Sequence, residues 1–479
     1  MARPWDRLDP KDYVRLQESL LGEFVGQFLY PFSPFYRDLF DRNEINPSSI
    51  QRLRDLERIP MVSRADFELK PSDNWRPFRA LLRPDEDSLK RWAHRKVLRR
   101  MAREKLLRGD DAAERLLAEE FKPMHLHLPQ EAGGPLVGYT IRDLSVLSQV
   151  GARAFTVLGA RRSDVLVSTL PYGPHLPFWQ TYYGAMGKGM SAFHLGGGDT
   201  VRPSRAAYWL DRVEATALVT ETGYAEGLLQ GAPPSILAGL RLLVLWAVGG
   251  MQGARERFTT RLRSTGATEA ATVTMMGIPE ARVAWAECPT PPGRPEASNG
   301  YHTYPDLELL EVVDVRTGRP MSEGEPGEIV YTSLDWRGSA LLRYRTGVIA
   351  RRGITRQPCP GCGRTVPRVL PDLSHRDWEA RVVTDRGKVR VDLADVFPVL
   401  WRSKVALWQL EMVRDVGPAG GDLVTAYMGG ANPWDLKDLE PALAAYGVRV
   451  QGLSVPEIGR RLGVGLERPE ARIVVRSGR

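Results

Sequence analysis

The stretch Glu311–Thr346 reads EVVDVRTGRPMSEGEPGEIVYTSLDWRGSALLRYRT, and its pattern decides how this part of the chain folds. Two strand-like runs, DLELLEVVDV and GEIVYTSL, follow one another closely, and the turn segments RTGRP and EGEPGE lie between them. Short connections rich in glycine and proline are typical of antiparallel strands. We therefore expect a small antiparallel, barrel-like unit from about residue 300 to 370.

The region before this stretch has a different pattern. Between about residues 135 and 280, apolar runs such as DVLVSTL, MSAFHL, ATALVT and LRLLVLWAV alternate with helical segments such as RPSRAAYWLDRV. Strands that alternate with helices predict βαβ units and a largely parallel sheet. Residues 1 to about 120 are predicted to be helical.

The chain after about residue 372 mixes strand-like and helical segments, and we place a domain boundary there. A chain of 479 residues is too long for one ordinary core. The expected fold class is α/β. A large N-terminal domain over 1–371 combines the parallel sheet with the antiparallel unit, and a small, mobile α+β domain covers 372–479.

The composition narrows the class of protein. The hydrophobic fraction of 43% and charged fraction of 26% are typical of a soluble globular protein. Three cysteines cannot form a disulfide framework and favour a reducing compartment. The polar N-terminus MARPWDRLDPKDYVRLQ has no apolar signal core, and the longest apolar run is too short to cross a bilayer. We expect a cytoplasmic protein without a membrane span.

The net charge of +8 is not spread evenly: a dense cluster of arginine and lysine lies in the segment LKRWAHRKVLRRMAREKLLRGDDAAERLLAEEF (Leu89–Phe121). The segment is predicted to be an amphipathic helical insertion, in which one stripe is shared by Trp92, Val97, Leu98, Met101 and Leu106. An arginine-rich, solvated surface helix is the simplest interpretation, and a helix that binds phosphate or docks a partner is the alternative. No interleaved aromatic residues support specific nucleic-acid binding.

Four stretches together resemble the phenylacetate-CoA ligase branch of the adenylate-forming enzymes. They are SPFYRDLFDRNEINPSSIQRLRDLERIPMVSRADF (33–67), YGAMGKGMSAFHLGGGDT (183–200), the stretch 311–346 that ends in R-Y-R-T, and DVFP (395–398). They occur in the family's order along nearly the whole chain. The resemblance implies an adenylate-forming fold with a C-terminal lid. It also implies that ATP and Mg²⁺ activate a carboxylic acid before coenzyme A receives the acyl group.

Two of the family's ATP-binding segments depart from its pattern. The phosphate loop, expected as S-S-G-T-T-G-K-P, reads HLPQEAGGP here, so Gly133 and Gly134 remain but the hydroxyls and the lysine do not. Glu131 stands where a hydroxyl is expected, and its carboxylate would repel a triphosphate. The Y-G-L-S-E segment reads MMGIPE, in which Gly277 and Glu280 remain. Met276 replaces the tyrosine expected beside adenine.

Two further departures lie toward the C-terminus. The R-Y-R-T-x-D motif reads RYRTGV, so Val348 replaces the aspartate expected to hold the ribose hydroxyls. A valine side chain cannot accept a hydrogen bond. In PEARIVV, Glu470 stands where the family's catalytic lysine is expected. Because each lost charge-assisted contact is worth about 1.5–3 kcal/mol, we expect ATP use to be impaired or lost.

The leading hypothesis is therefore a ligand-binding or regulatory homologue. The candidate catalytic residues are Glu280, Arg343 and Arg345, and the candidate nucleotide-binding residues are Gly133, Gly134, Gly249, Gly250, Gly277, Tyr344, Thr346 and Asp377. The first alternative is an active carboxylate-CoA ligase, in which Arg343, Arg345 and Lys188 contact phosphate and which uses ATP, Mg²⁺ and coenzyme A. The second is a protein-interaction subunit that uses the basic helix.

All three cysteines fall near the R-Y-R-T segment. Cys359 and Cys362 form the C-x-x-C of CPGCGR, while Cys288 precedes His302 in WAECPTPPGRPEASNGYH. Relatives carry a cysteine, a histidine and a cysteine pair in these segments, which implies a Cys₃His structural Zn²⁺ site. A redox-active pair is the alternative for the C-x-x-C. Because one constellation uses every cysteine, we favour zinc.

The remaining histidines and aromatic residues give weaker indications. His125 and His127 are expected on one face of a strand, and His194 is expected to be structural. His175 lies where relatives form the acyl pocket. Four aromatic residues have two open interpretations, as the lining of a pocket for an aromatic acid or simply as part of the core: Phe178, Trp179, Tyr182 and Tyr183. The candidate ligand is a carboxylic acid or acyl-type molecule. A protein partner and a homodimer are further candidates.

Overall fold

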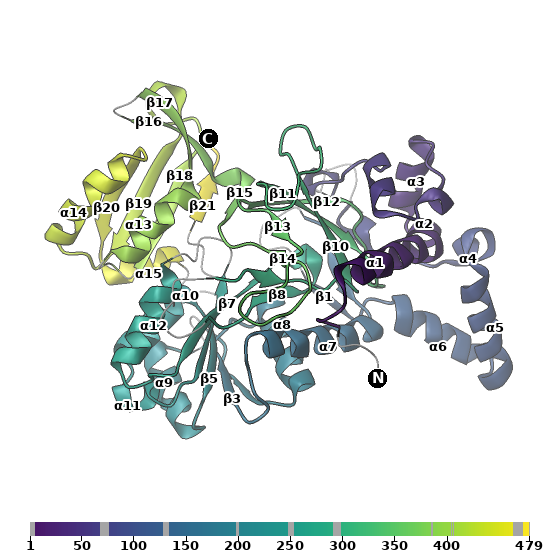
Figure 1. The fold of residues 1–479 in the computed structure, drawn as a ribbon, viewed down its shortest axis with the longest axis horizontal. Coiled ribbons are helices and arrows are strands. Elements are labelled where there is room, and N and C mark those ends of the chain that lie inside the picture. The colour runs from purple at the N-terminus through teal and green to yellow at the C-terminus, as the bar shows by residue number, and fades with distance from the viewer. Residues whose placement is uncertain are drawn as a thin grey trace.

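The computed structural model describes residues 5–67, 76–127, 134–197, 201–247, 253–290, 298–384, 387–403, 405, 407–462 and 473–478. Figure 1 shows a central body, a helical N-terminal region at one end and the C-terminal region at the other. None of the described helices combines the length and apolar character needed to cross a membrane.

The N-terminal region is helical, as predicted, with short 3₁₀ turns between residues 47 and 80. Its helices are α1 (Pro10–Phe24), α2 (Tyr30–Phe32), α3 (Pro34–Arg42), α4 (Glu86–Trp92), α5 (Arg95–Arg108) and α6 (Asp110–Phe121). Asp9 caps α1 by accepting a hydrogen bond from the backbone N–H of Lys11, and Pro10 occupies the first turn, where its missing N–H costs nothing.

The predicted basic helix is not continuous. The extended backbone of Ala93 ends α4, and Gly109, at φ 88°, forms the turn between α5 and α6. The expected single stripe does not form: Trp92 lies in α4, before the first break, and within α5 Val97 and Met101 are half-buried, whereas Leu98 and Leu106 are exposed.

A nine-stranded sheet forms the centre of the body, in the order β13-β14-β9-β8-β7-β6-β5-β3-β4. Its parallel part confirms the predicted βαβ pattern and contains β3 (Val165–Ser168), β4 (Ser191–His194), β5 (Ala217–Glu221), β6 (Leu242–Ala247) and β7 (Ala271–Gly277). The antiparallel part contains β8 (Ala284–Glu287), β9 (Tyr301–His302), β13 (Ile354–Thr355) and β14 (Arg368–Val369). The connecting helices are α7 (Ile141–Val157), α8 (Leu176–Lys188), α9 (Pro203–Arg212), α10 (Thr222–Gly231), α11 (Pro234–Leu237) and α12 (Ala254–Ser264).

The stretch Glu311–Thr346 contributes to a separate antiparallel sheet, as predicted. This sheet has the order β10 (Glu308–Val313), β11 (Gly327–Ser333), β12 (Tyr344–Ala350) and β15 (Leu373–His375). A small antiparallel pair, β1 (His125–His127) and β2 (Val137–Tyr139), lies before α7. Because β15 pairs with β12, the chain leaves this sheet only after His375, slightly beyond the predicted boundary.

The C-terminal region has the expected α+β composition. It contains the hairpin β16 (Glu379–Thr384) and β17 (Gly387–Asp392), the sheet β18 (Leu407–Val413), β19 (Leu423–Gly429), β20 (Val448–Leu453) and β21 (Ile473–Arg476), and the helices α13 (Phe397–Arg402), α14 (Pro433–Ala444) and α15 (Val455–Leu462). It packs on the body where Phe258 of α12 meets Trp401 of α13, with ring centroids 6.3 Å apart. Arg257 also donates to the Ser403 carbonyl at 2.8 Å.

Candidate functional site

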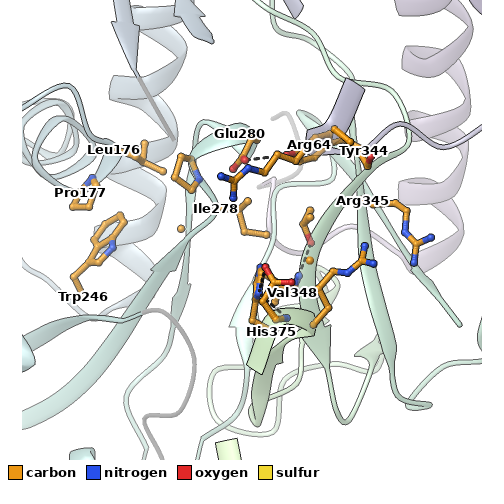
Figure 2. Close-up of a pocket in the computed structure, with 18 residues that line it drawn as sticks. Arg64, Leu176, Pro177, Trp246, Ile278, Glu280, Tyr344, Arg345, Val348 and His375 are labelled. Atoms are coloured by element: carbon orange, nitrogen blue, oxygen red, sulfur yellow. Dashed lines mark hydrogen bonds and ion pairs between the residues drawn. The ribbon is translucent and has the colours of Figure 1, made fainter. Parts of the chain in front are cut away.

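A cavity of about 490 Å³ lies where the two sheets, α8 and the start of the C-terminal region meet (Figure 2). Its lining comes from the carboxyl ends of β6 and β7, which is where ligands bind in open α/β sheets. It consists of Ser63, Arg64, Ala65, Leu176, Pro177, Trp246, Gly277, Ile278, Pro279, Glu280, Tyr344, Arg345, Thr346, Gly347, Val348, His375, Arg376 and Asp377. The cavity thus brings together six of the predicted site residues: Glu280, Arg345, Gly277, Tyr344, Thr346 and Asp377.

Tyr344 and Glu280 form a hydrogen-bonded pair in the cavity wall. The Tyr344 hydroxyl donates to Glu280 Oε1 at 3.0 Å. Burial, followed by the charge of Glu280, raises the pKa of Tyr344 well above its ordinary value, so the phenol stays protonated and keeps donating. This pair fixes the Glu280 carboxylate at the mouth of β7, where it could hold a cation or a ligand hydroxyl.

Gly277 allows two apolar side chains to approach the cavity wall closely. A Cβ at this position would lie 2.9 Å from both Leu176 Cδ2 and Trp246 Cζ2. Both of these neighbours line the cavity. Glycine is therefore required for packing at this position, whatever the cavity binds.

Arg345 lines the cavity, but its charge is already paired. Its Nε donates to Glu328 at 2.9 Å, and its Nη2 contacts the same carboxylate and donates to the Val315 carbonyl at 2.6 Å. Glu328 is completely buried and also accepts from the Gly347 N–H at 3.0 Å. A ligand phosphate would therefore have to compete with a buried carboxylate for this guanidinium.

Arg343, a candidate catalytic residue, is not among the residues that line the cavity. Its guanidinium pairs with Glu311 at 2.9 Å and donates to the Leu56 and Ile59 carbonyls at 2.9 and 2.8 Å. A left-handed backbone, with φ 49°, directs this residue away from its neighbours in the motif. Arg343 thus ties the N-terminal region to the antiparallel sheet.

Val348 lies on the cavity wall beside the joint to the C-terminal region. It pairs with His375 across β12 and β15, and its N–H donates to Thr346 Oγ1 at 3.1 Å. The Thr346 hydroxyl itself donates to the Ile329 carbonyl at 2.7 Å. The cavity's other carboxylate belongs to Asp377, 3.5 Å from His375 Nδ1 and half exposed. The position of the expected ribose acceptor is therefore apolar.

Several predicted residues lie away from the cavity or outside the described residues. Gly134 is buried and does not contribute to the lining. Lys188, at the end of α8, donates to Thr156 Oγ1 at 2.8 Å and does not reach the cavity, so it supplies no phosphate contact there. Five positions lie outside the described residues: Gly133, Gly249, Gly250, Glu131 and Glu470.

The sequence analysis missed Arg64, Trp246 and His375, which all line the cavity. For the loop that carries Arg64, a signal was present. Ser63 and Asp66 have the spacing of a capping box, and the Asp66 carboxylate accepts from the Ser63 N–H at 2.7 Å. Nothing local in the sequence places this loop against β12. A backbone hydrogen bond does so, in which the Arg345 N–H donates to the Val62 carbonyl.

Most of the predicted histidines and aromatic residues form one cluster of rings on and around α8, in which Phe178 and His127 are buried and Tyr182 is exposed. His125 and His127 share a face of β1, as expected, with ring centroids 4.6 Å apart. His125 packs on Trp179, and His194 packs on Phe178 and Tyr182. No described residue partners either ring nitrogen of His127, and burial lowers the pKa of that imidazole to about 3.

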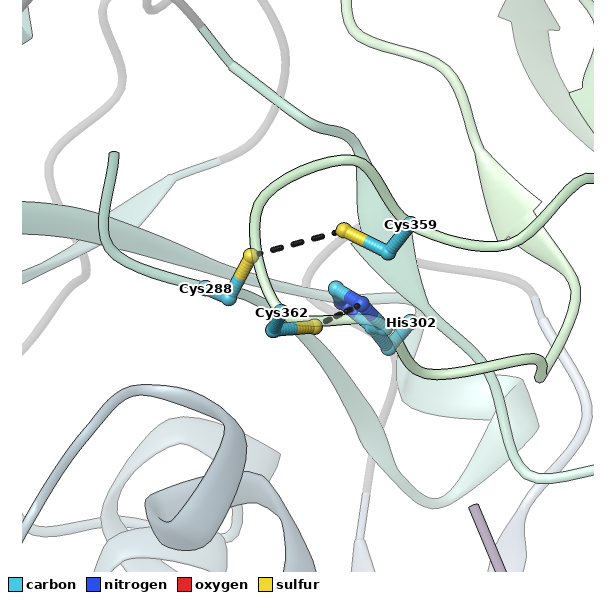
Figure 3. Close-up of side chains that lie close together, drawn as sticks. All are labelled: Cys288, His302, Cys359 and Cys362. Atoms are coloured by element: carbon cyan, nitrogen blue, oxygen red, sulfur yellow. Dashed lines mark hydrogen bonds between the residues drawn. The ribbon is translucent and has the colours of Figure 1, made fainter. Parts of the chain in front are cut away.

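A second candidate site brings Cys288, His302, Cys359 and Cys362 together (Figure 3). Their four donor atoms all lie within 4.8 Å of one another. Cys288 Sγ is 3.6 Å from Cys359 Sγ, and Cys362 Sγ is 3.3 Å from His302 Nε2. Zinc–sulfur bonds of about 2.3 Å in a tetrahedron separate two sulfurs by about 3.8 Å. The cluster can therefore hold a structural metal ion such as zinc.

The surrounding backbone orients these ligands. His302 Nδ1 lies 3.1 Å from the Ala286 carbonyl, which favours the proton on Nδ1 and leaves Nε2 free to bind metal. The knuckle is closed by the Gly363 N–H, which donates to the Cys359 carbonyl at 2.8 Å, and Gly363 adopts φ 69°. Hydrogen bonds from Cys288 and then Cys359 lower the pKa of Cys362, which favours the thiolate that a metal needs.

Comparison with known proteins relates about three quarters of the chain to one group of enzymes. No protein-family model matches the sequence. The phenylacetate-coenzyme A ligase of Thermus thermophilus is 29% identical over 373 residues, which cover 77% of this chain and 72% of that enzyme. The Escherichia coli K12 enzyme of the same name is 23% identical over 373 residues, covering 76% and 72%. The chain is a distant homologue of phenylacetate-coenzyme A ligases.

Solved structures show the same fold. A crystal structure of 2-hydroxyisobutyryl-CoA ligase in the postadenylation state, in complex with R3-HIB-AMP, has a TM-score of 0.71 at 17% identity, covering 98% of this chain and 91% of that chain. The same ligase in the thioesterification state, with 2-HIB-AMP and CoA, has a TM-score of 0.58. The phenylacetate-CoA ligase-like chain therefore has the adenylate-forming fold, with a large N-terminal and a small C-terminal domain.

Proposed function

We propose that this phenylacetate-CoA ligase-like protein binds a carboxylic acid or acyl-type ligand in the cavity lined by Glu280 and Tyr344. We also propose that its ability to adenylate such a ligand is impaired or lost. The observation that carries the proposal is the chemistry of β12. Val348 contributes methyl groups where a nucleotide ribose would need a hydrogen-bond acceptor, and Arg345 is held by buried Glu328.

The test of this proposal separates ligand binding from catalysis. Purified protein is assayed for acid-dependent exchange of pyrophosphate into ATP, with aromatic and aliphatic acids and Mg²⁺. We expect no exchange and no binding of millimolar ATP·Mg²⁺ by calorimetry. Binding of an acid without exchange supports the proposal, and a clear exchange signal contradicts it.

An active carboxylate-CoA ligase is the second candidate, and the polar cavity lining favours it. Glu280 and Asp377 supply carboxylates, and Arg64 and Arg376 supply positive charge within the same cavity. In such an enzyme, Glu280 would help hold Mg²⁺ and Asp377 would take over the ribose contact from position 348. Glu280→Gln would then abolish exchange, whereas a binding-only protein has no exchange to lose.

We further propose that Zn²⁺ occupies the Cys₃His cluster and that the chain bends between Ser374 and Asp377. Zinc would use all four ligands, leaving no open position for catalysis, so its role would be to join the loops after β8 and β13.

At the proposed joint, two contacts link the body to the start of the C-terminal region. Ser374 Oγ donates to Asp392 at 2.6 Å, and Arg351 pairs with Asp395 at 2.6 Å. Limited proteolysis should cut near residues 374–377 first if the C-terminal domain from about 372 is mobile.

A further inference from the structure

Helix α5 is the outermost element of the helical region, at the opposite end of the molecule from the C-terminal domain (Figure 1). It has 14 residues, and none of them is buried. Among the described elements, its extensive packing is with α6 alone. A helix of this kind contributes little to a core, so its side-chain pattern must be explained by its outer face.

Two parallel rows of side chains run along that outer face. Leu98, Ala102 and Leu106 are spaced at i, i+4 and i+8, and so are Arg95, Arg99 and Arg103. All six residues are exposed, Leu98 at 41% and Leu106 at 86%. An apolar row therefore lies directly beside a basic row.

The charges of the basic row have no ion-pair partner among the described residues. The sequence of α5, RKVLRRMAREKLLR, contains seven basic residues and one acidic residue. Arg100 pairs with Glu120 and Arg108 with Glu104, at 2.9 and 3.3 Å. Within the described chain, no ion pair engages Arg95, Arg99 or Arg103. These guanidinium groups are available to an external anion.

The tip of the α5–α6 hairpin is also apolar. Leu106 and Leu107 are 86% and 63% exposed and lie just before Arg108 and the turn at Gly109. Adjacent residues point about 100° apart on a helix, so the tip presents leucine in two directions. A nucleic acid would contact the arginines but gain nothing from these leucines.

We propose that α5 lies on an anionic lipid surface, with its leucines in the headgroup–acyl boundary and its arginine row on lipid phosphates. A helix with basic and apolar rows on its exposed side is typical of a peripheral membrane helix. An acidic protein helix fits less well, because it would need a groove, and the outer face of α5 is the convex edge of the molecule. A flat surface can meet this edge without touching the C-terminal domain.

Vesicle flotation of the full-length protein tests the proposal. The probes are phosphatidylcholine vesicles with about one-third phosphatidylglycerol and vesicles of phosphatidylcholine alone, at low salt and at about 0.15 M salt. We expect flotation with the anionic vesicles only. The charge variant is R95Q/R99Q/R103Q, and the apolar variant is L98S/L106S. All of these side chains are exposed, so neither variant should unfold the protein.

Both variants should float at least about tenfold less than the unchanged protein. Val455→Ser, an exposed apolar residue on α15, is the matched control and should float normally. Normal flotation of L98S/L106S would overturn the proposal, because attachment would then be a matter of charge alone. The proposal would also be overturned if the unchanged protein did not float, or if it floated equally well with uncharged vesicles. Binding to duplex DNA that L98S/L106S loses as much as R95Q/R99Q/R103Q does would overturn it as well.

Discussion

The candidate metal-ligand cluster and the cavity lie in the same body of the protein. They differ in whether all the polar groups expected for their ligand are present. In the cluster, Cys288, His302, Cys359 and Cys362 bring every donor atom within 4.8 Å of the others. In the cavity, Gly277 and Tyr344 keep the shape of the wall, while Val348 supplies no polar atom. A buried donor cluster is strained without its ligand, whereas a residue that faces an open cavity can be exchanged at little cost to folding.

The largest effect is expected from removing one metal ligand. Cys359→Ser should lose the bound zinc and lower the free energy of unfolding by about 4 kcal/mol or more, because metal binding is part of folding at structural sites. Metal analysis and urea unfolding measure both quantities. Asn299→Ala is the control. It removes only the amide 3.6 Å from Cys288 Sγ, so zinc should stay and the loss should be about 1 kcal/mol or less. Unchanged zinc content in Cys359→Ser would mean that the zinc is not bound by this cluster, and the contrast with the cavity would be lost.

The second effect tests whether Arg343 belongs to the fold or to the cavity. Arg343→Met should lower the free energy of unfolding by about 3–5 kcal/mol, because it leaves Glu311, whose side chain is only 15% exposed, without its partner. Burial already raises the pKa of Glu311 in the intact protein. The double variant R343M/E311L should recover much of the loss. Normal stability of Arg343→Met with lost ligand binding would instead return this arginine to the cavity.

Local patterns predicted much of this architecture. The alternation of apolar runs and helices gave the parallel strands β3 to β7, and the turns around Glu311–Thr346 gave the antiparallel sheet. The four candidate metal ligands were also predicted, from the resemblance to relatives together with the scarcity of cysteine in the chain. Arg343 could not be separated from Arg345 in this way, because a positive φ at one residue sends two nearby arginines to different places. Likewise, the break at Ala93 was not visible in the amphipathic pattern of the basic helix.

Two buried histidines extend the comparison between partnered and unpartnered groups. His302 has the Ala286 carbonyl at one nitrogen and Cys362 at the other, whereas His127 has no described partner. The pKa of His127 is lowered to about 3, so only the unfolded chain takes up this proton below about pH 6.5. Stability should therefore fall as the pH drops from about 6.5 toward 3.

This dependence on pH is measurable by substitution. His127→Phe should lose less stability than the unchanged protein between pH 7 and 5, by about 2 kcal/mol, because one titrating group is gone. Urea unfolding at several pH values gives the slope, which is independent of any packing change from the new ring. Identical slopes for His127→Phe and the unchanged protein would mean that the imidazole has a partner after all.

The smallest effect is expected at Val348, the position where the resemblance led us to expect an aspartate. Val348→Asp places a carboxylate on β12 beside His375, at a half-buried position, so the fold should tolerate it with a change of about 1 kcal/mol. The substitution alone should not produce pyrophosphate exchange, because the chain still lacks the hydroxyls expected in HLPQEAGGP. Val348→Asn, similar in size but uncharged, is the matched control. Exchange in Val348→Asp but not in Val348→Asn would show that a single carboxylate separates this cavity from an active one, and the proposed loss of adenylation would then rest on one residue.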